Sequence, residues 1–125
     1  MKKRNESSLV TACMKYLQCL ENLGKIAWHD RLNSGSYNVT TRRRDKHGVW
    51  TSYNSRVQGC RKGTPDIFFV TPYGQVVWVE CKRGTKQSSG QTEFQNKFDQ
   101  LPNHYYMIAE STDDINRFLI NLELL

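Results

Sequence analysis

The sequence lacks a hydrophobic run of transmembrane length, and no apolar stretch follows the basic residues at its start before Lys15. We therefore expect neither a membrane span nor a secretion signal, and no membrane partner. The four cysteines form no C-x-x-C pair and match no zinc-ligand spacing, which favours free thiols in a reducing cytoplasm. Repeats and low-complexity segments are also absent, and the composition is ordinary for a globular chain. The 125 residues suit one domain spanning 1–125.

Acidic residues are scarce in one part of the chain. Residues 31–62 contain a single acid, Asp45, against eight basic residues, and the whole chain carries a formal net charge of +6. Such concentrated positive charge favours a polyanionic partner, nucleic acid before membrane, although a solvated surface loop is the alternative. The residues predicted to contact nucleic acid are Arg31, Arg42, Arg43, Arg44, Lys46, Arg56, Arg61 and Lys62.

Hydrophobic periodicity predicts an α/β fold with a central mixed β-sheet flanked by helices, in the order α-β-β-β-α-β-α. Asn5 is a suitable N-cap for the first helix, and Ser88 with Gln91 forms a capping box for the second. The apolar stripe of the second helix is predicted as Phe94, Phe98 and Leu101. The expected elements are helices over 6–22, from Ser88 and from Ser111, strands over 25–30, 67–70, 76–79 and 104–110, and a two-stranded ribbon inserted within 31–62 with its turn at 45–48.

The inserted ribbon needs a partner, because two strands alone are marginal in water. DNA, a second subunit and the body of the domain are the three possibilities.

Residues 63–84, GTPDIFFVTPYGQVVWVECKRG, contain two apolar segments joined by Pro72-Tyr73-Gly74. This three-residue loop suits a type I turn followed by a left-handed glycine. It fixes the register of a hairpin in which Asp66 stands directly opposite Glu80. Both faces of the hairpin are apolar, so we expect helices to cover both.

Two carboxylates that face each other at such a place repel, so another feature must offset the repulsion. Side-chain alternation puts Lys82 on the face of Asp66 and Glu80, and Cys81 on the other face. A divalent cation is one solution, because two carboxylates plus waters are a usual protein share of a Mg²⁺ site. A proton on one acid with a raised pKa, or a structural ion pair with Lys82, is the alternative.

Pro65-Asp66 followed by Glu80-Cys81-Lys82 resembles the PD-(D/E)xK nuclease signature. The wider context is similar to the VRR-NUC family of virus-type replication and repair nucleases over nearly the whole chain. The resemblance implies a restriction-endonuclease-like core, dependence on Mg²⁺ or Mn²⁺, and hydrolysis of DNA phosphodiester bonds in a bacterium or phage-infected cell. It also implies a homodimer that cuts branched DNA, such as Holliday junctions or flaps, in replication, recombination or repair. The segments that carry it are RLNSG at 31–35, GTPDIFFV at 63–70, VECK at 79–82 and SSGQTEFQ at 88–95, with an acid in the first helix.

Carried over residue by residue, the resemblance makes Asp66 and Glu80 the metal carboxylates and the backbone carbonyl of Cys81 a further ligand. Lys82 then orients or activates the attacking water. The inserted ribbon has no counterpart in the family pattern, so its role is not implied by the resemblance.

The remaining two site residues have structural alternatives. Glu6 matches the first-helix acid of the family, and so joins the metal ligands, but an acid there also stabilises a helix N-terminus. Glu21 is a rival acid at the other end of the same helix. Gln91 matches the helix glutamine of the family, and so joins the catalytic set, but is also the capping-box partner. The three histidines are isolated and expected to be structural.

Two other functions fit the same residues. One is a non-catalytic nucleic-acid-binding module on a nuclease-like scaffold, and the other is a restriction-type, sequence-specific endonuclease. Retention of both opposed acids with Lys82 favours a structure-selective, metal-dependent deoxyribonuclease over the binding module. A sequence-specific enzyme needs a base-reading region, which only residues 31–62 offer.

Overall fold

A computed structural model describes residues 6–33, 36–84 and 86–125. With the ribbon set aside as an insertion, the described elements follow the predicted order α-β-β-β-α-β-α. The predicted N-cap Asn5 lies outside the described residues. The elements are α1 (Glu6–Asn22), β1 (Trp28–Arg31), β2 (Ser36–Arg44), β3 (Trp50–Gln58), β4 (Ile67–Val70), β5 (Val76–Cys81), α2 (Ser89–Phe98), β6 (His104–Ala109) and α3 (Thr112–Asn121).

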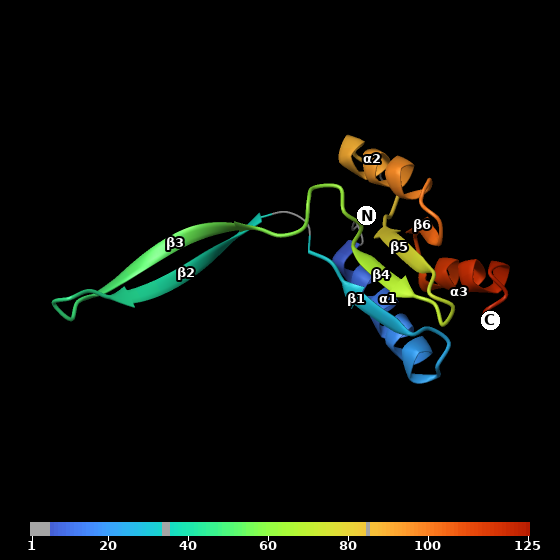
Figure 1. The fold of residues 1–125 in the computed structure, drawn as a ribbon, viewed down its shortest axis with the longest axis horizontal. Coiled ribbons are helices and arrows are strands. Elements are labelled where there is room, and N and C mark those ends of the chain that lie inside the picture. Colours follow the sequence, from blue (N-terminus) through green and yellow to red (C-terminus); the bar gives the residue numbers. More distant parts are fainter. Residues whose placement is uncertain (1–5, 34–35, 85) are drawn as a thin grey trace, which may run out of the picture.

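The body of the protein is a four-stranded mixed sheet in the order β1-β4-β5-β6, which confirms the α/β class (Figure 1). β1, β4 and β5 pair antiparallel, whereas β5 and β6 pair parallel and are joined through α2. Two parallel strands need a crossover connection, so α2, which connects β5 and β6, lies over one face of the sheet. α1 and α3 pack on the other face. No helix in the described part of the chain has both the length and the apolar character to cross a membrane.

The core lies between α1, α3 and one face of the sheet. The predicted α1 stripe of Val10, Cys13, Leu17 and Leu20 is buried there, as is Leu9. It packs with the hairpin side chains of that face and with two residues of α3. These partners, all fully buried, are Ile67, Phe69, Val77, Val79, Ile115 and Leu119.

The β4–β5 hairpin has the predicted register. Thr71 N–H donates to the carbonyl of Gln75 at 2.9 Å, and the pairing continues from Val70 opposite Val76 to Ile67 opposite Val79. Gly74 closes the turn with φ of 81°, the left-handed conformation that the loop requires. The turn therefore fixes which side chains reach the far end of the hairpin.

The second face of the sheet is covered by an aromatic cluster from α2. Phe94 and Phe98 stack on each other at 4.2 Å between ring centroids, and each lies 5.2 Å from Trp78 of β5. The prediction that Leu101 continues this stripe is wrong. The helix ends at Phe98, and Leu101 lies in the following turn, where it is 41% exposed.

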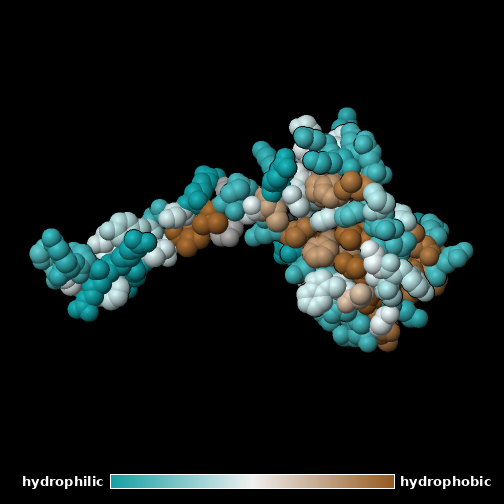
Figure 2. All heavy atoms as spheres, in the orientation of Figure 1, coloured by the Kyte–Doolittle hydropathy of each residue, from teal (hydrophilic) through white to brown (hydrophobic). Residues whose placement is uncertain are grey.

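β2 and β3 form a separate two-stranded sheet that projects from the body as an arm (Figure 1). The predicted turn is confirmed: the Asp45 carboxylate accepts the N–H groups of His47 and Val49 at 2.8 and 2.9 Å. Neither strand packs against another described element, which removes the domain body as the partner. Figure 2 shows mostly hydrophilic side chains along the visible face of the arm.

A glycine pair fixes the chain that leads from the arm into β4. Gly63 has φ of 94°, and a Cβ at this position would overlap the backbone of Gly90 at the start of α2. Since Asp66 follows Gly63 and Gln91 follows Gly90, this close approach sets the distance between two predicted site residues.

We expect Gly63→Ala to lower the free energy of unfolding by about 3 kcal/mol, through left-handed strain and an overlap that only backbone movement relieves. Gly24→Ala is the matched control, because Gly24 also has positive φ, at 73°, but open space around it. That change should cost only about 1 kcal/mol. Urea denaturation measures both, and equal losses would show that the Gly63–Gly90 contact carries no stability.

Candidate active site

Two acids meet at the end of the hairpin that lies opposite the turn. Asp66 immediately precedes β4, Glu80 lies near the end of β5, and one further step of the hairpin register sets them opposite each other. The N–H of Cys81 donates to Oδ2 of Asp66 at 2.9 Å. Asp66 is therefore held by a backbone contact as well as by the register of the hairpin.

Burial sets the protonation of this pair. Glu80 is only 3% exposed, and burial, followed by the charge of Asp66, raises the pKa of Glu80 to about 8. Burial also raises the pKa of Asp66, against the opposing effect of the Cys81 N–H. Without a cation, Glu80 is thus largely protonated at neutral pH, which is the alternative to a metal that the sequence left open.

Gln91 joins the helix cap to the acid pair. Its Oε1 accepts the backbone N–H of Ser88 at 2.8 Å, and its Nε2 donates to Oε1 of Glu80. The capping box is confirmed, since Ser88 Oγ accepts the N–H of Gln91 in return. The capping role of Gln91 is therefore confirmed and its side chain contacts Glu80, whereas its catalytic role stays a prediction.

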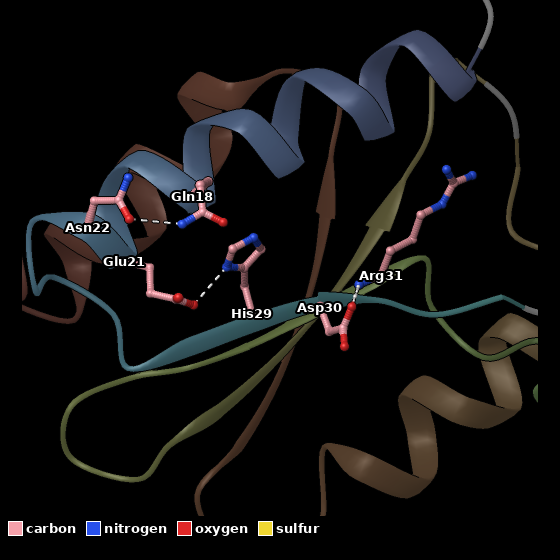
Figure 3. Close-up of polar contacts among 6 residues, drawn as sticks. All are labelled: Gln18, Glu21, Asn22, His29, Asp30 and Arg31. Carbon is pink, nitrogen blue, oxygen red and sulfur yellow. Dashed lines mark hydrogen bonds and ion pairs between the residues drawn. The ribbon is translucent and has the colours of Figure 1, made fainter.

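Three further charges act on the acid pair. Lys82 lowers the pKa of both acids, in keeping with its predicted place on their face, and its N–H is anchored to the carbonyl of Ala109 at 3.0 Å. Glu6, at the start of α1, raises the pKa of both. Arg31, at the end of β1, lowers the pKa of Asp66 and extends toward the N-terminal end of α1 (Figure 3).

Cys81 points away from the acids, as predicted. Its side chain is fully buried in the core, where it lies beside the thiol of Cys13. The role implied for its backbone carbonyl stays a prediction.

The residues present fit a divalent cation. Oε2 of Glu80 is buried and, among the described residues, has no hydrogen-bond partner. An unpartnered buried oxygen beside a second carboxylate is the hard-oxygen donor set that Mg²⁺ and Mn²⁺ prefer. In the described chain, however, no three His, Cys, Asp or Glu side chains gather closely enough to make a metal site by themselves. A cation would therefore be held by the side chains of Asp66 and Glu80, with the rest of its ligands from water, substrate or the backbone carbonyl predicted at Cys81.

Glu21, the rival acid of α1, serves another contact. It pairs with Nδ1 of His29 at 2.9 Å, at the end of α1 far from the acid pair (Figure 3). His104 is likewise structural, because its Nδ1 accepts the indole N–H of Trp78 at 3.0 Å.

The predicted nucleic-acid-binding residues divide into two groups. Five lie on the arm, and Arg31, Arg61 and Lys62 lie outside it. Arg61 and Lys62 line a cavity of about 220 Å³ with Lys97 and the acid Glu93, over the aromatic floor of Phe94 and Phe98. Sequence reasoning missed Lys97, because only the tertiary contact between the 61–64 loop and α2 brings it there. The arm residues are Arg42, Arg43, Arg44, Lys46 and Arg56.

Comparison of the chain with protein-family models, curated proteins and solved structures found no match. The family resemblance drawn from the motifs therefore stays a prediction, and any functional argument depends on the geometry of the acid pair and its surroundings.

The raised pKa of Glu80 predicts a specific pH dependence of stability. The folded protein holds the Glu80 proton more tightly than the unfolded chain, so this stabilisation is full below the unfolded pKa of 4.5 and is lost as pH rises through 8. Between about pH 5 and pH 9 the metal-free protein should lose on the order of 3 kcal/mol of unfolding free energy from this group.

Glu80→Gln should remove most of that slope, and Glu93→Gln, at an exposed acid of α2, should keep it. Urea denaturation in EDTA at each pH measures the effect. Identical slopes in wild type and Glu80→Gln would contradict a raised Glu80 pKa.

Proposed function

We propose that this protein is a divalent-cation-dependent hydrolase of DNA phosphodiester bonds, built on a restriction-endonuclease-like core. The observation that carries the proposal is the cross-strand pair of half-buried Asp66 and buried Glu80, in which Oε2 of Glu80 has no hydrogen-bond partner among the described residues. Burial and like charge oppose the doubly ionised form of this pair, so that form needs a cation, whereas the metal-free pair keeps a proton on Glu80.

The residues take separate roles in this proposal. When bound, the cation supplies positive charge that polarises the scissile phosphate. Asp66 and Glu80 hold it, and Gln91 fixes the orientation of the Glu80 carboxyl through its hydrogen bond to Oε1. Lys82 contributes a compact positive charge at the attacking water and the developing transition state. Glu6 adds negative charge that strengthens the attraction for a cation.

DNA is the proposed substrate because basic side chains gather beside α2 and on the arm. Arg61, Lys62 and Lys97 line the cavity beside α2 together with Glu93, and in this proposal the three basic residues contact phosphates without reading bases. Branched DNA and action as a homodimer rest on the family resemblance alone, as does a site of action in the cytoplasm of a bacterium or phage-infected cell.

A non-catalytic nucleic-acid-binding module is the second candidate. The arm carries five basic residues and contains no residue of the acid pair, so DNA binding does not require catalysis. Cation-dependent cleavage separates the two candidates.

We expect Asp66→Asn and Glu80→Gln each to reduce Mn²⁺ affinity by at least about tenfold, because each removes one of two carboxylate ligands. Isothermal titration with Mn²⁺ measures the affinity, and circular dichroism shows that the fold is kept. A panel of linear, flap, fork and four-way DNA, with and without Mg²⁺, measures cleavage. Undiminished Mn²⁺ binding by both variants would exclude this cation site.

Lys82→Ala should keep Mn²⁺ and DNA binding but lose at least about a hundredfold in cleavage rate, because its charge acts in the transition state. Lys82→Arg should restore only part of the rate, since a planar guanidinium does not reproduce a compact ammonium. Single-turnover cleavage measures the chemical step. Wild-type rates in the alanine variant would refute the role of Lys82.

A further inference from the structure

The arm has two chemically different faces. β2 and β3 pair over nine residues, from Ser36 opposite Gln58 to Arg44 opposite Trp50. Because side chains alternate along a strand, this register fixes which residues share a face. The guanidinium face includes Asn38, Thr40, Arg42, Arg44, Trp50, Ser52, Asn54 and Arg56. The opposite face includes Val39, Thr41, Arg43, Thr51, Tyr53, Ser55 and Val57.

The guanidinium face is ordered by contacts across the two strands. The guanidinium carbons of Arg42 and Arg44 lie 5.4 and 5.9 Å from the ring centroid of Trp50. Thr40 donates a hydrogen bond to Oδ1 of Asn54 at 3.0 Å, further along the same face. A ring that holds two cations limits their conformational freedom, which lowers the entropy lost when they bind an anion. This face therefore presents positioned cations.

The opposite face differs in chemistry, although its exposure is similar. Val39 is 37% exposed and Tyr53 52% exposed, and Arg43 is the one basic residue of this face. Arg43 thus lies between Arg42 and Arg44 in the sequence, but its side chain is on the opposite face of the arm.

The dimensions of the arm match a groove of duplex DNA. Nine residues per strand give a length of roughly 30 Å. The major groove of B-form DNA, about 12 Å wide, admits a two-stranded β-ribbon, whereas the major groove of A-form RNA is too deep and narrow. The arm also has charge of the required sign, since residues 36–58 contain five basic side chains and one acid.

We propose that the arm docks on B-form duplex DNA through its guanidinium face and not through its opposite face. The inference rests on the proposed function for its choice of DNA, and it refines the sequence expectation, because Arg43 is removed from the contact set. Both chain segments that enter the arm also lead to the acid pair. The Leu32 N–H donates to the carbonyl of Asp66 at 2.7 Å, and the Cys60 N–H donates to the carbonyl of Asn33 at 2.7 Å. The base of the arm is thereby attached to the chain that carries Asp66.

The test compares Arg42→Gln, Arg44→Gln and Arg43→Gln in the full chain. These changes remove the same charge within three consecutive positions, so net charge is matched and only the face differs. Binding is measured by fluorescence anisotropy on an unbranched 30-base-pair DNA duplex in EDTA, over a range of salt concentrations. The RNA duplex of the same sequence is the second probe.

Arg42→Gln and Arg44→Gln should each weaken DNA binding about tenfold, the loss of one charge-assisted hydrogen bond. Each should also reduce the slope of log K against log salt by ~0.9, the value for one phosphate contact. Arg43→Gln should leave affinity within about twofold of wild type. Equal losses in all three variants, no loss in any, or equal wild-type affinity for the RNA duplex would overturn the proposal.

The two proposals fail separately. In one outcome, the protein binds DNA with the predicted difference between the two faces and cleaves no DNA in Mg²⁺. That result would refute the proposed hydrolase activity and support the proposed docking of the arm. In another outcome, the wild type cleaves DNA and Lys82→Ala does not, while the three arginine variants bind DNA equally. That result would refute only the proposed docking of the arm.

Discussion

The register that sets Asp66 opposite Glu80 is the constraint on which the rest of the candidate site depends. The three-residue turn at Pro72-Tyr73-Gly74 leaves the hairpin only one register, so the two acids cannot slide apart. Burial then strengthens their interaction and raises the pKa of Glu80. Other contacts act on this enforced pair: Gln91 orients one carboxyl and the Cys81 N–H holds the other.

Burial of apolar side chains in the core offsets the free energy that the acid pair costs the folded state. The same two strands that carry the acids bury Ile67, Phe69, Val77 and Val79 completely on the face of α1 and α3. Each such side chain contributes about 1.5–3 kcal/mol when buried, so one face of the hairpin offsets the cost of the acids at its end. Because one face of the hairpin supplies this apolar burial, the fold remains stable although the Glu80 carboxyl is buried.

Much of the fold was predictable because its signals are local. Turn chemistry gave the hairpin register, the spacing of apolar residues gave α1, and the Ser88 capping box gave the start of α2. The contacts of Lys97 and the approach of Gly63 to Gly90 were not predictable, since they depend on how α2 crosses the sheet. Leu101 was misplaced for a related reason: apolar spacing continues past Phe98, but the helix does not.

Separation of the arm from the body solves an electrostatic conflict. DNA binding needs many cations, whereas a carboxylate pair surrounded by cations would lose its attraction for a metal ion. The cations that act most strongly on Asp66 are Lys82 and Arg31, both outside the arm. Arg42, Arg44 and Arg56 lie on strands that pack against no other described element, and screening in salt limits their effect to about 10 Å. In the proposed function, positive charge on the arm thus adds affinity for DNA without changing the protonation of the acids.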